Sequence, residues 1–388
     1  MIYLDYAATT PPRQETLLAY TEAAHKCWGN TQSLHDVGTN AHDLFQSCRQ
    51  MIASLIGARQ EGIYFTGNAS EANQLGIRSV LRGRPMHLKE IVTIKMEHAS
   101  VLNTMNELEK EGYFIHYLPV DEKGIVSVEQ YKKIVNRETA LVVIQYVNSE
   151  MGAIQPIQTL ANWAKSVGVP FHCDAVQALG KLPIHVEEMN VTSAVFSAHK
   201  CFGPKGVGVA YVDPSVHWQA LYEGTTHQSS FRAGTVDVPS IAAATIACKL
   251  AVEEQETSYM HAKRIEQYIE ERMSTLEYPL QLTGKKEERS PFIYGFLLPN
   301  IEGQWMMLEC NREQIAISTG TACKIGFGEA ASAMAAIGYE ADDTRRFIRI
   351  SIHKQTTTSE IDEFFAVLSR SLQTSSIDRL ALEACENI

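Results

Sequence analysis

The sequence predicts an α/β protein in two parts: a large domain with a mainly parallel sheet, followed by a smaller α/β domain. The chain has 388 residues, more than one ordinary hydrophobic core uses. Its middle alternates short apolar, β-rich runs with helix-length segments, which is typical of βαβ units. After about Glu253 this alternation gives way to a long polar helix pattern, short strands and turns. We therefore expect a large domain over residues 13–255 and a small domain over residues 256–388.

The individual elements follow from hydrophobic periodicity. Apolar residues recur three or four positions apart from Leu44 to Leu55, which predicts an amphipathic helix. Apolar, β-rich runs predict strands at Glu90–Lys95, Phe114–Val120, Leu141–Val147, Pro170–Cys173, Ala194–Ser197 and Val207–Val212. Helix patterns are found at Ser127–Asn136, Ile157–Val167, Met260–Leu276 and around Ile361–Leu368, and a further strand at Phe347–Ile352. Residues Gln373–Ile388 carry little pattern, and a mobile end is expected there.

Composition excludes several classes of partner. The formal net charge of −11 argues against nucleic acid or an anionic membrane, because both select basic surfaces. There is no positively charged start followed by an apolar core, and no apolar run approaches the roughly twenty residues that span a bilayer. A cytoplasmic protein is expected. The eight cysteines show neither a CxxC pair nor zinc-ligand spacing, so no metal site is predicted. The charges of Lys285–Arg289 are mixed in sign, which predicts a solvated loop.

Lys200 and Asp174 form the strongest chemical signal. The strand-like run Ala194–Phe196 ends in Ser-Ala-His-Lys before a Gly/Pro turn, which places Lys200 at a strand tip, where α/β proteins hold their active sites. Asp174 ends the neighbouring strand-like run. A lysine beside a turn is usually only a surface group, but this pair suits pyridoxal 5′-phosphate (PLP). The lysine forms a Schiff base with PLP, and the aspartate keeps its pyridine nitrogen protonated.

A phosphate-binding helix start is predicted at Thr66–Asn73. The segment contains a glycine turn, then Ser70 as a possible N-cap, then a run that permits a helix. Backbone N–H groups and short hydroxyls at a helix start suit a phosphate. Helix capping alone would need no ligand, and that alternative remains open at this point.

Six motifs in order, from Tyr3–Thr10 to Arg349–Ser351, carry a family resemblance. The chain resembles the cysteine desulfurases of the NifS/IscS group, within the class V aminotransferases, which are fold type I PLP enzymes. The resemblance implies a seven-stranded, mainly parallel sheet in the large domain. It also implies that residues 1–12 pack with the small domain and that the enzyme is a homodimer.

The resemblance implies a set of cofactor contacts. In the phosphate cup these are Ala69, Ser70, Ser197 and His199, and around the ring His98, Asp174, Gln177 and Lys200. His98 would stack on the pyridine face and is a candidate acid/base, because the pKa of a histidine lies near neutrality. Gln177 would hydrogen-bond the 3′-oxygen. Thr235 would reach the phosphate of the partner subunit, so that only the dimer has a complete site.

Two residues are expected to contact the substrate. Where the family often has Val-Asn-Asn-Glu, this chain has Val147 to Glu150 with a serine in third place, so Ser149 falls at the position of an asparagine that contacts cofactor and substrate. Asn148 is not assigned to that contact. Arg349 lies in an apolar strand, where an unpaired guanidinium would be unfavourable. It either pairs with a neighbouring carboxylate or, as the resemblance implies, clamps the substrate carboxylate.

Cys323 separates the possible PLP chemistries. It lies in Ile317–Gly328, whose glycines, serines and threonines are typical of a mobile loop, and Lys324 would favour the thiolate. The family pattern Ser-Gly-Ser-Ala-Cys is matched here by Thr-Gly-Thr-Ala-Cys. The resemblance implies that Cys323 takes the sulfur of L-cysteine as a persulfide, releases alanine, and passes the sulfur to an iron–sulfur scaffold or a thiolation protein. The alternative is an incidental loop cysteine.

Three other functions compete with this hypothesis. A class V aminotransferase would not need Cys323, and a selenocysteine lyase would prefer the seleno-substrate. A non-catalytic assembly partner that kept the fold would bind no PLP. The presence of Lys200, Asp174 and Gln177 argues against this last alternative.

Overall fold

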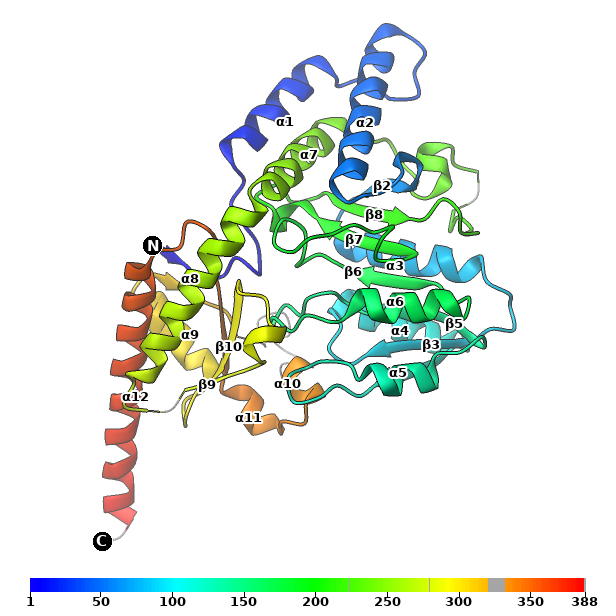
Figure 1. Ribbon diagram of the computed structural model, residues 1–388. Coiled ribbons are helices and arrows are strands. Elements are labelled where there is room, and N and C mark those ends of the chain that lie inside the picture. The colour runs from blue at the N-terminus through cyan, green and yellow to red at the C-terminus, as the bar shows by residue number, and fades with distance from the viewer. Residues whose placement is uncertain (223, 279, 320–331, 387–388) are drawn as a thin grey trace.

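The computed structural model describes residues 1–388 apart from 223, 279, 320–331 and 387–388, and it describes only the backbone of 332 and 374–386. Figure 1 shows a large sheet with helices on both sides, a smaller group of strands and helices beside it, and a C-terminal helix that extends away from the rest.

A seven-stranded sheet forms the centre of the larger part, in the order β2-β8-β7-β6-β5-β3-β4. Its strands are β2 (Ile63–Thr66), β3 (Glu90–Ile94), β4 (Phe114–Leu118), β5 (Thr139–Val143), β6 (Phe171–Asp174), β7 (Ser193–Ser197) and β8 (Gly208–Val212). Only β8 is antiparallel to its neighbours, β2 and β7. The mainly parallel sheet is therefore confirmed. β5 ends earlier than expected, because Val147 leaves the sheet and pairs with Ile154 in an isolated bridge.

Helices cover both faces of this sheet because successive strand side chains point to opposite faces. In β5, Leu141 and Val143 join one apolar cluster, which α3 (Ala69–Arg82) and α4 (Ala99–Lys110) cover. Val142, on the opposite face, joins the cluster under α5 (Val128–Ile134) and α6 (Ile157–Ser166). The other helices of this part are α1 (Gln14–Lys26), α2 (Asp36–Leu55) and α7 (Val238–Glu253), with the 3-10 turns η1 (Gln60–Gly62), η2 (Ala198–Lys200) and η3 (His227–Ser230).

The smaller part is built on a three-stranded antiparallel sheet in the order β12-β10-β9. Its elements are α8 (Gln255–Ser274), β9 (Gln281–Leu282), η4 (Lys286–Glu288), β10 (Ile293–Leu297), α9 (Gly303–Arg312), β11 (Ile315–Ala316), α10 (Ser332–Ala336), α11 (Ala341–Arg345), β12 (Phe347–Ser351) and α12 (Thr358–Glu386). The start of the chain joins this part: β1 (Ile2–Tyr3) pairs in parallel with β11, and the Ser351 amide donates to the Leu4 carbonyl at 2.7 Å.

One expectation for this part is wrong. Arg289 is not in a solvated loop but is 2% exposed, because its guanidinium pairs with the fully buried Glu266 of α8 at 2.8 Å. The sequence shows little pattern in Gln373–Ile388, yet α12 continues to Glu386. No proline or glycine interrupts residues 373–386, so the helix begun by the apolar face around Phe364 can propagate.

Among the described residues, no helix combines the length and the apolar character needed to cross a bilayer.

Candidate active site

The predicted site residues that follow β2, β3, β6 and β7 gather at one edge of the large sheet. Lys200 follows β7 in η2, and Asp174 is the last residue of β6. The starts of α3 and α4 follow β2 and β3. Since β2, β3, β6 and β7 all run in the same direction, their carboxyl ends meet at this edge, the usual place for an α/β active site.

Lys200 is half-buried and points at the N-terminal segment of the chain. Its ammonium donates to the carbonyl of Ala7 and, at 2.7 Å, to that of Ala8. Burial, together with the positive charges of Lys181 and Arg349, lowers the pKa of Lys200 to about 7. Near neutral pH a large share of this amine is therefore unprotonated and nucleophilic.

Asp174 is buried at 6% exposure and accepts one hydrogen bond on each oxygen. Oδ1 accepts from the backbone of Val176 at 3.0 Å, and Oδ2 accepts from Nδ2 of Asn73 at 2.8 Å. A carboxylate has further lone pairs, so this side chain can still accept from a protonated pyridine nitrogen.

The predicted phosphate cup is a helix start, but its cap differs from the one expected. Asn68, not Ser70, is the N-cap of α3, and its side chain accepts from the amide of Glu71 at 2.9 Å. Ser70 lies inside the first turn with an exposed side chain and is not used for capping. Ala69 begins the helix beside it. Strand β8, which pairs with β2, approaches the start of α3 closely: a Cβ on Gly208 would lie 2.4 Å from the backbone carbon of Asn68.

Ser197 is the last residue of β7, and His199 follows it in η2. The buried hydroxyl of Ser197 has no hydrogen-bond partner among the described residues. Burial, together with the positive charge of Lys200, lowers the pKa of His199 to about 4, so the ring is neutral at pH 7. Its Nδ1 lies 3.1 Å from Oγ1 of Thr9.

His98 is the exposed N-cap of α4, and its hydrogen bonds select one tautomer. Nδ1 accepts from the backbone amide of Ser100 at 3.1 Å and lies 2.8 Å from Oγ of the same residue. Because Nδ1 is an acceptor, the neutral ring carries its proton on Nε2.

Gln177 is held in one orientation by a lysine that the sequence did not single out. Its Oε1 accepts from Nζ of Lys181 at 3.1 Å, and its Nε2 donates to the Ala7 carbonyl at 2.9 Å. Burial lowers the pKa of Lys181 to about 8. The donor end of the amide therefore lies beside Ala7, as does Lys200.

Arg349 pairs with a carboxylate of this chain, which was one of the two alternatives expected for it. Its Nη2 pairs with Oδ1 of Asp5 at 2.6 Å, and its Nη1 donates to the carbonyl of Ser149 at 2.9 Å. Its buried Nε has no partner within the described part of the chain. Asn148 keeps its side chain for its own turn, with Oδ1 accepting from the amides of Glu150 and Met151.

Two predicted residues remain. Thr235 is exposed in the segment between η3 and α7. Cys323 lies outside the described residues.

The residues present fit PLP. The orphaned hydroxyl of Ser197 and the exposed hydroxyl of Ser70 at a helix start offer donors for a phosphate. Asp174 offers an acceptor for a pyridinium, and Lys200 offers an amine for the aldehyde.

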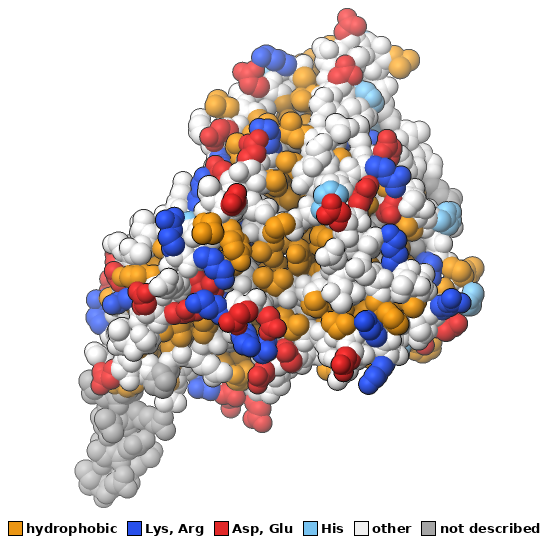
Figure 2. Space-filling model, in the orientation of Figure 1, with side chains coloured by type: hydrophobic (Ala, Val, Ile, Leu, Met, Phe, Trp, Pro, Cys, Tyr) orange, Lys and Arg blue, Asp and Glu red, His pale blue; other side chains and the backbone are white. Residues whose placement is uncertain are grey.

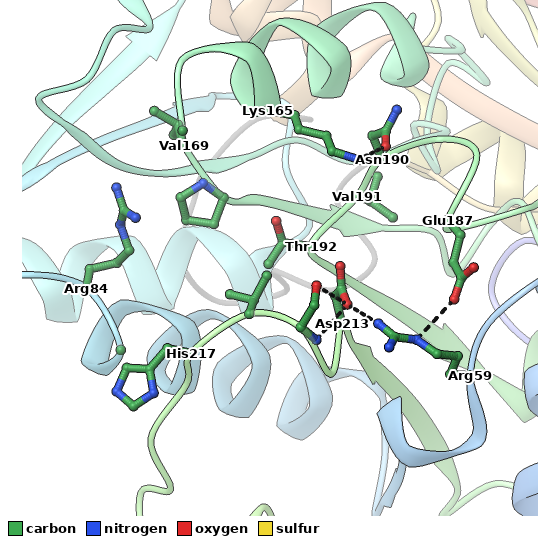
Figure 3. Close-up of a pocket in the computed structure, with 15 residues that line it drawn as sticks. Arg59, Arg84, Lys165, Val169, Glu187, Asn190, Val191, Thr192, Asp213 and His217 are labelled. Atoms are coloured by element: carbon green, nitrogen blue, oxygen red, sulfur yellow. Dashed lines mark hydrogen bonds and ion pairs between the residues drawn. The ribbon is translucent and has the colours of Figure 1, made fainter.

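A hollow of about 550 Å³ lies at the opposite edge of the sheet from these residues, where β6 and β7 begin (Figure 3). Arg59 turns toward Asp213 at 2.9 Å and Glu187 at 3.5 Å, and Lys165 donates to Asn190. No residue predicted for the site lines this hollow.

The chain is similar to known proteins along nearly all of its length. Residues 2–364 match the aminotransferase class-V family. One relative is a Bacillus subtilis (strain 168) protein named as a cysteine desulfurase, NifS. It is 41% identical over 365 residues, which cover 94% of this chain and 92% of that protein.

Two solved structures show the same fold. A NifS-like protein has a TM-score of 0.89 and 30% identity, with 96% of this chain and 99% of that chain covered. SspA in complex with cysteine has a TM-score of 0.80 and 28% identity, with 92% and 100% covered.

Proposed function

Since this chain belongs to the cysteine desulfurases of the aminotransferase class-V family, we propose that it uses PLP to remove the sulfur of L-cysteine, with alanine as the other product. The observation that carries the assignment is the placement of Lys200, with its lowered pKa, and Asp174 at the same sheet edge. When bound, PLP supplies an aldehyde for amines and a ring that accepts electrons from the substrate α-carbon.

Each cofactor-holding role goes to a residue whose position suits it. Ala69, Ser70, Ser197 and His199 would hold the phosphate at the start of α3 and the end of β7. Asp174 would accept from the ring nitrogen. Gln177 would donate through Nε2 to the phenolic oxygen, because Lys181 fixes its Oε1 on the other side.

Proton transfer is assigned to Lys200 and His98. With its pKa lowered to about 7, Lys200 can take or return a proton at neutral pH. The Nε2–H tautomer of His98 makes this ring a donor toward the site and fixes which nitrogen exchanges a proton.

Arg349 would bind the substrate carboxylate. Its buried Nε and its Nη atoms form a planar set of donors, which suits bidentate binding of a carboxylate. Asp5 holds this guanidinium in place in the described chain, and the substrate would share it or displace Asp5. The carbonyl of Ser149 limits the rotation of the guanidinium, and the hydroxyl of Ser149 would reach the substrate from the same turn.

Cys323 would receive the sulfur. Its thiolate attacks the substrate sulfur, an S–S bond forms as the substrate C–S bond breaks, and alanine leaves after protonation of its β-carbon. The sulfur then passes to an acceptor thiol, on an iron–sulfur scaffold or a thiolation protein.

A homodimer would complete the site. Five large apolar side chains are exposed on α1 and the connection to α2, namely Leu17, Leu18, Tyr20, Trp28 and Leu34. Figure 2 shows apolar side chains between α1 and α2 and in the centre of the same face. Exposed apolar groups gathered in this way mark an interface. Thr235, also exposed, would reach the phosphate of the partner subunit.

We also propose the division into 13–255 and 1–12 with 256–388, and a cytoplasmic location. The pairing of β1 with β11 supports placing the first residues with the small domain. The six described cysteines are free thiols, as is usual in a reducing compartment.

The test is incubation of the PLP-loaded protein with L-cysteine and a reductant, followed by measurement of alanine and sulfide. Equal amounts of both products from the wild type, and neither from Lys200→Ala, are expected. Bound PLP with no alanine would contradict the proposal and leave an aminotransferase as the better assignment. A strong preference for selenocysteine in direct competition would instead indicate a lyase for that substrate.

A further inference from the structure

A chain of buried polar side chains runs behind Asp174, under α3. Asn73 is 1% exposed, His172 0% and Ser193 1%. Ser193 Oγ lies 2.6 Å from Nδ1 of His172, and Nε2 of that ring lies 3.0 Å from Oδ1 of Asn73. Asn73 Nδ2 then donates to Oδ2 of Asp174 at 2.8 Å. None of these three residues has a role in the proposed chemistry.

The direction of every bond in this chain is determined. An ionised carboxylate only accepts, so Asn73 turns its amide nitrogen to Asp174 and its carbonyl oxygen to His172. The second hydrogen on Nδ2 goes to Oγ of Ser100 at 3.0 Å. His172 must then donate from Nε2 and accept on Nδ1 from the Ser193 hydroxyl. A neutral imidazole satisfies both requirements, and burial keeps the ring neutral by lowering its pKa to about 3.

A second buried acid, Glu97, accepts fewer hydrogen bonds than Asp174 among the described residues. Glu97 is 1% exposed, and its Oε2 has no partner among the described residues. Burial raises the pKa of Glu97 well above its ordinary value, and the charge of Asp174 raises it further. Asp174 instead receives the Asn73 donor, which is itself held by His172 and Ser100.

We propose that Asn73 is a positioning residue, which fixes the ionised carboxylate of Asp174 so that it can accept from the ring nitrogen of the bound cofactor. His172 and Ser193 act through Asn73 by preventing the amide from turning over. The proposal deepens the proposed function and rests on one part of it, that the cofactor is PLP.

The test is equilibrium binding of two probes to the apo protein. One is PLP, and the other is the analogue with CH in place of the ring nitrogen, which keeps the aldehyde and the phosphate but cannot donate to Asp174. For Asn73→Ala we expect PLP binding to weaken about tenfold or more, since a hydrogen bond to a charged group is lost. The affinity for the analogue should stay within about twofold of the wild-type value, because the analogue makes no hydrogen bond to Asp174 that the substitution could weaken.

Matched variants separate this role from a general effect on the fold. Gln74→Ala changes the neighbouring, exposed residue of α3 and should leave both affinities unchanged. Asp174→Asn should reproduce the selectivity of Asn73→Ala. If Asn73→Ala does not fold, Gly76→Ala serves instead, because its Cβ would lie 3.1 Å from Cε1 of His172 and press on that ring from a helix position. It should weaken PLP binding alone, by a smaller factor.

Equal weakening of both probes by Asn73→Ala would show a merely structural role and overturn the proposal. So would unchanged PLP binding, or a wild type that binds both probes equally well. A wild type that prefers PLP but yields no alanine from L-cysteine would contradict the proposed function. The comparison of the two probes would still test the role of Asn73.

Discussion

The rate at which the apo protein forms its covalent bond to PLP should rise with pH around a midpoint near 7, because only the neutral amine of Lys200 attacks an aldehyde. The ordinary pKa of a lysine is 10.5, and burial with two neighbouring positive charges lowers that of Lys200 to about 7. At pH 7 about half of the Lys200 amines are then neutral, against roughly one in three thousand for an ordinary lysine. At pH 6 the neutral fraction falls to about one in eleven, so the rate should drop about fivefold between these two values.

The assay is stopped-flow absorbance of apo protein mixed with excess PLP between pH 5.5 and 9. Lys181→Met removes one of the positive charges while it keeps the apolar stem, so the midpoint should move to higher pH. Lys205→Met removes an exposed lysine from the loop that follows Lys200, and it should leave the midpoint unchanged. A wild-type midpoint near 10, or a Lys181→Met midpoint equal to that of the wild type, would refute the reasoning.

Three further predictions concern packing and burial. Gly208→Ala should weaken PLP binding without changing a cofactor contact, since its Cβ would lie 2.4 Å from the backbone of Asn68 at the start of α3; an unchanged affinity in a titration would contradict this. Glu266→Ala should lower the free energy of unfolding by about 3–5 kcal/mol in a urea titration, because Arg289 would be left as a buried, unpaired charge, whereas Glu266→Leu with Arg289→Met should recover most of the loss. His172 has a pKa of about 3 when folded, below its ordinary 6.5, so between these values the unfolded chain binds more protons and stability falls as the pH falls. At pH 5 this residue should account for about 2 kcal/mol of the loss, and His172→Gln should flatten the pH profile.

The sequence carried enough information to predict the sheet and the place of Lys200 and Asp174 at one of its edges. Each of these two residues comes at or just after the end of a short, mostly apolar run, and such a position can be recognised from the sequence alone. The carboxyl ends of parallel strands meet at one edge, so local patterns also predicted that these two residues lie near each other.

The supporting residues could not be predicted in this way. Asn73 lies within the apolar face of a helix, and its partner Asp174 is distant in sequence, so no local pattern distinguishes it from a surface asparagine. The pairing of Arg349 with Asp5 likewise joins the two ends of the chain. Arg289 was misread because a run of mixed charges gives no sign of the buried glutamate on α8 that it meets.

The ends of helices could also be predicted only in part from the sequence. Asn68 and Ser70 are both good N-cap residues, and the choice between them depends on the backbone of the preceding turn rather than on residue type. α12 extends beyond its apolar face because nothing in residues 373–386 stops a helix, although no pattern there predicts one.

The central claim, that Cys323 accepts the sulfur of L-cysteine, is tested most directly by the mass of the protein itself. The PLP-loaded enzyme is mixed with L-cysteine without reductant, quenched and analysed by mass spectrometry as intact protein and as peptides. The account predicts the addition of one sulfur atom to the peptide that contains Cys323, and no addition in Cys323→Ala, which should keep its bound PLP. Alanine release with the added sulfur on another cysteine, or an equal addition in Cys323→Ala, would contradict it.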